Sequence, residues 1–193
     1  MSARRTGIVG TPLLDWDDTL RAAKARHRRR VRRIGIGAVG ITLVLSTVAL
    51  PPAPRLVWNA SASAPIGLYA VSPGTAAHPG DMVVARPPEP HRRLAATRRY
   101  VPLNVPLVKR VSATVGDEVC ALGRQVFVNG RPVAERLDVD RAGRSLPQWS
   151  GCRRLRGDQR FLLMDAPASF DGRYFGVTEG SDIVGKARLL WAR

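Results

Sequence analysis

The stretch that determines the fold class is 67–85, GLYAVSPGTAAHPGDMVVA. It contains two short apolar runs, at 67–71 and 81–85. Between them lie the turn-forming triplets SPG at 72–74 and HPG at 78–80. Short runs rich in Val and Tyr and bounded by Gly and Pro are typical of β-strands. This stretch therefore predicts a mainly β domain.

The same pattern continues toward the C-terminus. Further strand-like runs lie at 107–111, 125–128, 160–164 and 183–190. Asn129-Gly130 follows one of these runs and is a strong hairpin signal. The stretches 86–106 and 136–157, rich in Pro, Gly and charge, are predicted to be loops or excursions from the sheet. Helical periodicity is weak and no internal repeat is found.

In the other direction lies an uncharged stretch of 17 residues, 34–50, which ends at the sequence PPAP. A membrane-spanning helix needs about 17–25 apolar residues. The preceding run RHRRRVRR at 26–33 places that end in the cytoplasm by the positive-inside rule. The sequence predicts a cytoplasmic basic segment at 1–33, a transmembrane helix at 34–50 and an exported domain at 51–193.

Two alternatives apply to this N-terminal part. A cleaved signal peptide has an apolar region of about 7–15 residues and an early start, whereas this segment is longer and starts late. The polar segment before it is predicted either to form a short amphipathic helix from about Leu13 or to be disordered.

The formal net charge of +16 raises the question of nucleic-acid binding. Much of this charge lies in the run beside the apolar segment, and no aromatic residues interleave with it as base stacking requires. We therefore expect no specific nucleic-acid partner. Cys120 and Cys152 lack a metal-site spacing. In an exported domain they are expected to form a disulfide, and two buried thiols are the alternative.

The three histidines, at 27, 78 and 91, lie in the basic flank, a turn and a Pro/Arg-rich loop. A Ser–His–Asp triad therefore lacks a suitable histidine. The sequence also contains no zinc spacing, no P-loop and no dinucleotide fingerprint. We expect neither a metal nor a cofactor, and an enzyme of this kind needs another general base.

Such a base is available in the run LVKRV at 107–111. Strand alternation places Lys109 and Arg110 on opposite faces, so one of them points inward. Burial lowers the pKa of a lysine, and a neutral lysine can take a proton from a serine hydroxyl. Candidate serines, Ser61 and Ser63, lie in WNASASAPIGLY at 58–69. The alternative is that Lys109 extends into solvent from an edge strand.

A third segment, MDAPASFDGRYFG at 164–176, concentrates an acid, a hydroxyl, an arginine and aromatics after a predicted strand. Its alternative interpretation is a surface turn with an exposed Asp171–Arg173 pair, which would contribute little to stability.

Together these segments resemble the TraF-type conjugative transfer signal peptidases, relatives of the type I signal peptidases. The matching features are SASAPIGLY at 61–69, KRV at 109–111, Gly116-Asp117 and SFDGRYFG at 169–176. The resemblance covers about residues 34–193. General signal peptidases carry Met after the nucleophile, whereas this chain has Ala64-Pro65, which favours the transfer branch.

The resemblance implies a curved, signal-peptidase-like β-sheet domain and a role for each site residue. Ser63 is implied to be the nucleophile and Lys109 the general base. Ser61 and the backbone N–H of Ser63 would form the oxyanion hole. The implied supporting residues are Ser169, which would orient the lysine, Asp171, an acid that the transfer peptidases need, and its partner Arg173. The paired Cys120 and Cys152 also fit this branch.

The function implied is maturation of a conjugative pilin precursor by cleavage, or by acyl transfer that gives a cyclic pilin. The expected location is a bacterial inner membrane, with a single pass, the catalytic domain in the periplasm and a conjugative transfer apparatus as a further partner. Two alternatives stay open: a general type I signal peptidase, and a membrane-tethered β-domain that binds DNA or a secretion channel.

Overall fold

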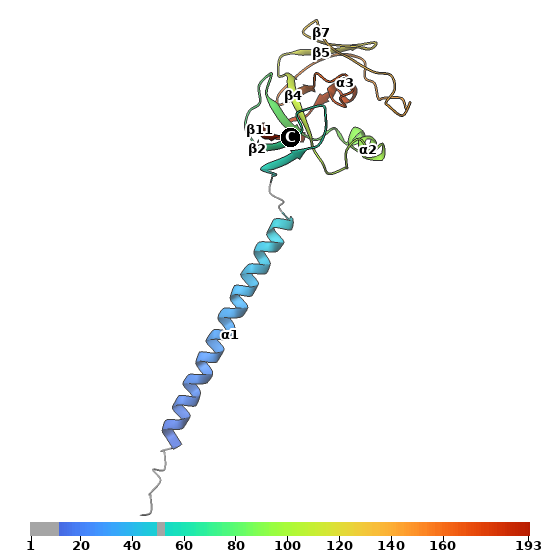
Figure 1. Cartoon of the computed structure of the whole chain (residues 1–193). Coiled ribbons are helices and arrows are strands. Elements are labelled where there is room, and N and C mark those ends of the chain that lie inside the picture. The colour runs from blue at the N-terminus through green and yellow to red at the C-terminus, as the bar shows by residue number, and fades with distance from the viewer. Residues whose placement is uncertain (1–11, 50–52) are drawn as a thin grey trace, which may run out of the picture. The chain divides into compact units, whose positions relative to one another are not determined.

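The computed structural model describes residues 12–49 and 53–193. The chain divides into two units, Met1–Pro52 and Ala53–Arg193. The first contains one helix, α1 (Pro12–Ala49), which begins close to the helix start predicted at Leu13 and continues without a break through the predicted boundary at 33/34 (Figure 1). Leu50, the last residue of the predicted transmembrane segment, lies outside the described residues. Within 12–49 and 53–193, no helix combines the length and the hydropathy that a membrane crossing requires.

The second unit, here called the β domain, contains a seven-stranded antiparallel sheet. Its strand order is β1-β2-β11-β3-β4-β9-β10. The strands are β1 (Leu56–Asn59), β2 (Gly67–Ser72), β3 (Met82–Ala85), β4 (Leu107–Ala113), β9 (Arg160–Leu163), β10 (Val177–Thr178) and β11 (Ile183–Ala192). Register shifts interrupt β4 and β11. Such irregularities bend a strand and increase its twist, so the sheet is not a flat one.

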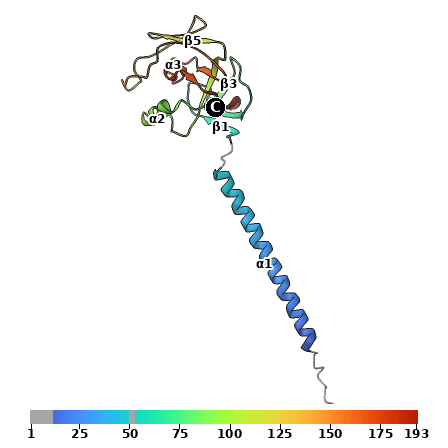
Figure 2. The same cartoon turned by 180° about the vertical axis from the view of Figure 1, so that it is seen from behind.

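A smaller, four-stranded sheet has the order β7-β6-β5-β8. Its strands are β5 (Glu118–Leu122), β6 (Gln125–Val128), β7 (Arg131–Glu135) and β8 (Gly151–Arg154). Figures 1 and 2 show it at the end of the domain opposite β1 and β2. The turn between β6 and β7 has positive φ at Asn129 and Gly130, as the hairpin prediction requires.

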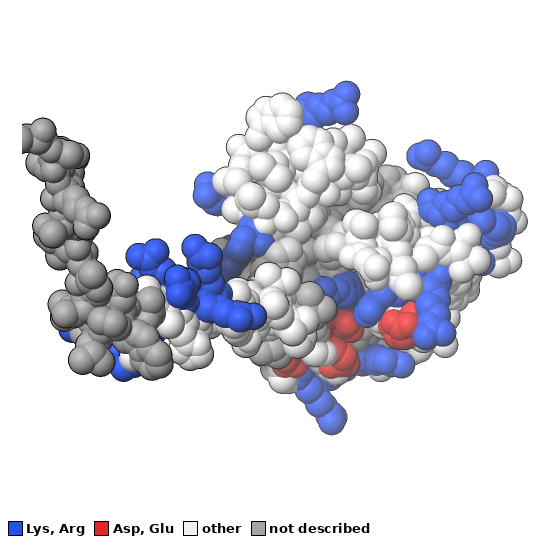
Figure 3. Space-filling model, turned by 90° about the horizontal axis from the view of Figure 1, so that it is seen from below, with Lys and Arg blue, Asp and Glu red and all other residues white. Residues whose placement is uncertain are grey.

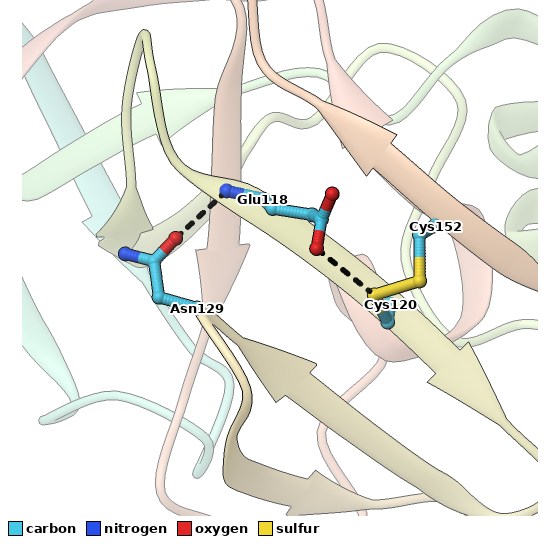
Figure 4. Close-up of a disulfide and its surroundings, with 4 residues drawn as sticks. All are labelled: Glu118, Cys120, Asn129 and Cys152. Atoms are coloured by element: carbon cyan, nitrogen blue, oxygen red, sulfur yellow. Dashed lines mark hydrogen bonds between the residues drawn. A yellow bond between two sulfur atoms is a disulfide. The ribbon is translucent and has the colours of Figure 1, made fainter.

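A disulfide joins β5 to β8. Cys120 and Cys152 are direct cross-strand partners, and their sulfur atoms are bonded (Figure 4). This confirms the disulfide prediction and excludes the alternative of two buried thiols. The carboxylate of Glu118 lies beside the bridge, with Oε2 3.9 Å from Cys120 Sγ.

The prediction of a mainly β domain is confirmed, and all six strands predicted from the sequence are present. The set was incomplete, because β1, β5, β7, β8 and β10 were not predicted. β8 lies inside the stretch 136–157 that was predicted to be a loop or an excursion from the sheet. Its sequence, GCRR, is fully exposed and has no apolar alternation, so hydrophobic periodicity could not identify it.

The stretch 86–106, predicted to be a loop or an excursion from the sheet, contains a helix, α2 (Glu89–Thr97), so it is an excursion and not an irregular loop over these nine residues. The helix begins directly after Pro88 and has a proline in its first turn, where the missing N–H costs nothing. Glu89 lies near its N-terminus and pairs with Arg93 one turn later. Two short helices, α3 (Gly172–Phe175) and a 3₁₀ turn (Gly180–Asp182), complete the domain.

Ion pairs neutralise some of the basic side chains of the β domain. Lys186 pairs with Asp81 at 2.9 Å, and Arg110 pairs with Asp165 at 2.8 Å. On the part of the β domain that Figure 3 shows, Lys and Arg side chains lie in several separate groups. The basic residues on that part therefore do not form one continuous stripe.

Candidate active site

The loop 60–66 connects β1 to β2 and carries both candidate serines. Ser63 is half-buried and Ser61 is exposed. Their Oγ atoms lie 3.0 Å apart, and the backbone N–H of Ser63 points toward Ser61 Oγ at 3.4 Å. One hydroxyl and one backbone N–H therefore lie next to the hydroxyl of Ser63.

Gly67 ends this loop at a point where no side chain fits. A Cβ at this position would lie 2.0 Å from the carbonyl oxygen of Trp191 on β11. The φ of Gly67 is 158°, close to the extended region, so the requirement for glycine is the close approach of β11. The glycine thus allows β2 to pair with β11 directly beside the serine loop.

Lys109 lies in the middle of β4, between β3 and β9. Only 3% of its surface is exposed, while Arg110 on the opposite face is partly exposed and pairs with Asp165. The inward orientation of a basic residue is therefore confirmed, and the edge-strand alternative is wrong because β4 is an interior strand. Lys109 Nζ lies 3.0 Å from Ser63 Oγ and 2.8 Å from Ser169 Oγ.

The environment of Lys109 makes its neutral form more accessible than that of a lysine in water. Its pKa falls from 10.5 to about 8 as the net result of three influences. Burial is the largest and lowers the pKa, the carboxylate of Asp171 raises it, and the guanidinium of Arg173 lowers it. Desolvation penalises the ammonium because it removes the water that stabilises a charge. A usable fraction of Lys109 is consequently a base near neutral pH.

Asp171 and Arg173 form a buried ion pair, with exposures of 0% and 2%. The guanidinium donates from Nε to Asp171 Oδ1 at 2.8 Å and from Nη2 to Oδ2 at 3.2 Å. Backbone N–H groups of Met164 and Arg173 also donate to the carboxylate. The remaining guanidinium contacts include the carbonyls of Met164 and Pro167. The alternative of an exposed surface turn is therefore wrong.

The ion pair holds the segment that carries Ser169 against β9. Asp171 caps α3, and its carboxylate reaches back to the N–H of Met164 directly after β9. Ser169, two residues earlier, is 2% exposed and faces Lys109. Because every contact of the Asp171 carboxylate is to Arg173 or to backbone, its link to Lys109 is electrostatic.

The sequence matches the protein family described as "Signal peptidase, peptidase S26" over residues 28–192. The chain is 32% identical over 180 residues to the plasmid transfer protein TraF of Escherichia coli, covering 86% of this chain and 99% of that protein. It is 30% identical over 173 residues to the probable conjugal transfer protein TraF of Sinorhizobium fredii, covering 84% and 91%. The chain is a TraF-type member of the peptidase S26 family.

The resemblance predicted from the sequence is thereby confirmed, and membership makes this S26 chain a serine peptidase. Among solved structures, a signal peptidase I from Enterococcus faecalis V583 matches with 19% identity over 58% of this chain and 97% of that chain. The TM-score of that match, 0.32, is too low to define a shared fold.

In this S26 peptidase the structure brings together six of the predicted site residues, which come from three distant segments. Ser61 and Ser63 lie on the β1–β2 loop, Lys109 on β4, and Ser169 and Asp171 in the segment between β9 and α3. Arg173, the predicted partner of Asp171, lies two residues further on, in α3. The disulfide of Cys120 and Cys152 belongs to the separate four-stranded sheet.

Asn59 is a contributor to this site that the sequence did not reveal. It is the last residue of β1, only 6% exposed, and its carboxamide bonds to the backbone of the serine loop. An Asn before a Ser/Ala/Pro segment is a common loop signal. That signal alone does not distinguish this position from an ordinary turn.

One cluster of potential metal ligands occurs in the part of the chain that the structure describes. Glu118, Cys120 and Cys152 place their ligand atoms within 4.8 Å of one another. The two sulfur atoms are joined in the disulfide, and a metal ligand would need to be a thiolate. This leaves the Glu118 carboxylate as the one remaining ligand of the cluster.

Proposed function

We propose that this S26 peptidase matures a conjugative pilin precursor by a serine–lysine mechanism. The observation that carries the proposal is the 3.0 Å separation of Ser63 Oγ and Lys109 Nζ, with the lysine almost fully buried. A nucleophile and a base within hydrogen-bond distance, with a third group that orients the base, is the arrangement that nucleophilic catalysis needs. Ser169 is the orienting group, 2.8 Å from Nζ.

The reaction begins when neutral Lys109 takes the proton of the Ser63 hydroxyl as Oγ attacks the carbonyl carbon of the scissile peptide bond. The tetrahedral intermediate carries its negative charge on the former carbonyl oxygen. The Ser61 hydroxyl and the Ser63 N–H are the donors available to that oxygen. The Lys109 ammonium then gives its proton to the leaving nitrogen, the C–N bond breaks, and an acyl-enzyme remains on Ser63.

The acyl group leaves when a second nucleophile attacks it. Lys109 takes a proton from water or from an amine, the new C–O or C–N bond forms, and the Ser63–acyl bond breaks with return of the proton to Oγ. Water gives a linear product, while the N-terminal amine of the same substrate gives a cyclic one. The Asp171–Arg173 pair supports this cycle by holding Ser169 in place.

The proposed substrate class is supported by the resemblance to the TraF-type transfer peptidases and by relatives described as a plasmid transfer protein and a probable conjugal transfer protein. The family description, signal peptidase, supports a second candidate, which is general removal of signal peptides. The two differ in substrate range, so an unrelated secretory precursor distinguishes them.

The proposal also includes location, with the N-terminus in the cytoplasm and the β domain in the periplasm of a bacterial inner membrane. Its support is the Arg-rich run at 26–33 before the uncharged stretch 34–50, together with the disulfide, which persists in oxidising compartments. Retention of the full chain in membranes after an alkaline wash is expected, and release into the wash would contradict it.

The experiment that tests the reaction is processing of a pilin precursor in cells that carry the full chain, read by mass spectrometry. Ser63→Ala and Lys109→Ala should each abolish processing. Ser72→Ala, at an exposed position, and Lys186→Ala, at a partly exposed one, are matched controls and should process normally. The product mass separates the linear from the cyclic form, and full processing by Ser63→Ala would refute the mechanism.

A further inference from the structure

The loop 60–66, which the structure describes in full, is irregular and has little backbone support of its own. A single backbone hydrogen bond closes within it, from Ala64 N–H to the carbonyl of Ser61 at 3.4 Å. This distance is long for an N–H···O bond, which is usually about 2.9–3.0 Å. Something else must hold Ser61 and Ser63 in place.

The carboxamide of Asn59 supplies that support. Its Nδ2 lies 3.0 Å from the carbonyl oxygen of Ser61, 3.1 Å from that of Ala64 and 3.0 Å from that of Pro65. Its Oδ1 accepts the backbone N–H of Ser61 at 3.1 Å. Tyr69 adds a bond from its hydroxyl to the Pro65 carbonyl at 2.9 Å. One buried side chain thus bonds to three residues of the loop.

These contacts determine the geometry of the reacting groups. Asn59 bonds to both backbone groups of Ser61, so it fixes the residue whose hydroxyl lies 3.0 Å from Ser63 Oγ. It also bonds to the carbonyl of Ala64, directly after the nucleophile. Asn59 itself has no contact with Ser63 or Lys109 among the hydrogen bonds of the described residues, so it acts through the loop.

We infer that Asn59 is a positioning residue of the peptidase, which holds Ser61 and Ser63 in the geometry that stabilises the oxyanion and keeps the nucleophile near its base. This inference rests on the proposed roles of Ser61 and Ser63. A displacement of about 1 Å at a reacting group can cost about 10²-fold in rate. Loss of the Asn59 donor should therefore lower turnover even where the protein remains folded.

The test variant is Asn59→Asp in the full chain. It has the same shape and keeps an acceptor for the Ser61 N–H, but it has no hydrogens to donate and puts carboxylate oxygen against three carbonyls. Asn129→Asp is the matched control in the β6–β7 turn. There Nδ2 donates to Asp117 at 2.8 Å, so the same change also replaces an attractive contact by a repulsive one, far from the serine loop in sequence and on the other sheet.

The first readout does not depend on activity. Amide hydrogen exchange followed by mass spectrometry should show exchange in the segment 60–66 rising at least about tenfold in Asn59→Asp, because its opening becomes easier. In Asn129→Asp the same segment should exchange as in wild type. Unchanged exchange of 60–66 in Asn59→Asp would show that Asn59 does not hold the loop and would overturn the inference.

The second readout is kinetic, at a temperature at which all variants are folded. Asn59→Asp should lower kcat by about 10²-fold with little change in KM, and Asn129→Asp should leave both unchanged. In a Ser61→Ala background the effect of Asn59→Asp should shrink below about tenfold, because residues that act through one another are not additive. If the losses of kcat caused by Asn59→Asp and Ser61→Ala multiply in the double variant, the inference is overturned.

The proposed function is tested separately, by Ser63→Ala in the same assay. If that variant stays active, the serine–lysine mechanism is wrong, and the exchange measurement still decides whether Asn59 orders the loop.

Discussion

Replacing Lys109 by methionine should abolish peptidase activity and stabilise the folded β domain. The lysine is 3% exposed, and burial lowers its pKa from 10.5 to about 8. The difference corresponds to about 3 kcal/mol of destabilisation while the lysine is charged in both the folded and the unfolded chain. Methionine is similar in length, flexible and uncharged, so it fills the site without this cost.

The lowered pKa of Lys109 determines how the stability of wild type changes with pH. Below pH 8 the lysine is protonated in both states, so the whole destabilisation is present. Between pH 8 and 10.5 the folded protein has lost a proton that the unfolded chain still binds, and the stability of wild type therefore rises with pH. The advantage of Lys109→Met is consequently largest at neutral pH and decreases toward pH 10.5.

The net gain is smaller than 3 kcal/mol because methionine leaves two hydroxyls without their partner. Ser169 is 2% exposed, and a buried polar group without a hydrogen bond costs about 1–3 kcal/mol. Ser63 is half-buried and can bond to water instead. We expect a net gain of about 0–2 kcal/mol at pH 7, or a Tm higher by up to about 6 °C for a domain of this size.

Thermal unfolding at pH 7 and pH 10, followed by near-UV circular dichroism of the full chain, measures this difference. Lys186→Met is the control, since Lys186 is 41% exposed and bonds to Asp81 at the surface. It should change the Tm little, with the same change at both pH values. The reasoning would be refuted if Lys109→Met were less stable than wild type at pH 7. It would also be refuted if the stability difference between this variant and wild type were the same at both pH values.

The remaining predictions concern rates. In wild type, kcat/KM should fall about tenfold for each pH unit below about 8, where Lys109 is protonated, and level off above it; a rate independent of pH from 6 to 9 would contradict this. Asp171→Asn removes the carboxylate that raises the Lys109 pKa, so the acid limb should move to lower pH. Arg173→Met removes the charge that lowers this pKa and should move the limb to higher pH. Each of these two changes should also cost about 3–5 kcal/mol of stability, measured by urea unfolding, because it leaves a buried charge unpaired. Ser61→Ala should lower kcat by about 10²–10³-fold with little change in KM; an effect confined to KM would remove Ser61 from the oxyanion hole.

The strands that the sequence revealed are those whose apolar residues face a core. β3 and β9 are almost wholly buried, and their runs of Val, Leu and Phe are distinct from the neighbouring turns. β7 and β8 are mostly exposed strands of the small sheet, and register with β5 and β6 determines them. Pairing between distant segments stabilises such strands, and a single sequence does not display that pairing.

The residues of the candidate site also divide into those that the sequence indicated and those that it did not. Lys109 could be found from its sequence because a lysine within an apolar interior strand departs from the usual pattern. The convergence of Ser63, Lys109 and Ser169 could not be derived from spacing, because 46 and 60 residues separate the partners; it came from the resemblance. Asn59 was missed because its role is to satisfy carbonyl groups of an irregular loop, which only the folded structure brings within its reach.

A catalytic lysine beside a buried carboxylate poses an electrostatic problem that the ion pair solves. A lone carboxylate in a low-dielectric interior would hold Lys109 as an ammonium and prevent it from acting as a base. Both oxygens of Asp171 are instead bonded to Arg173 and to backbone N–H groups, so its charge is largely compensated. Burial is then the largest influence on Lys109, and its pKa falls despite the nearby acid. Arg173 thus allows Asp171 to hold the Ser169 segment in place without trapping the base, which explains why the two single substitutions should shift the pH profile in opposite directions.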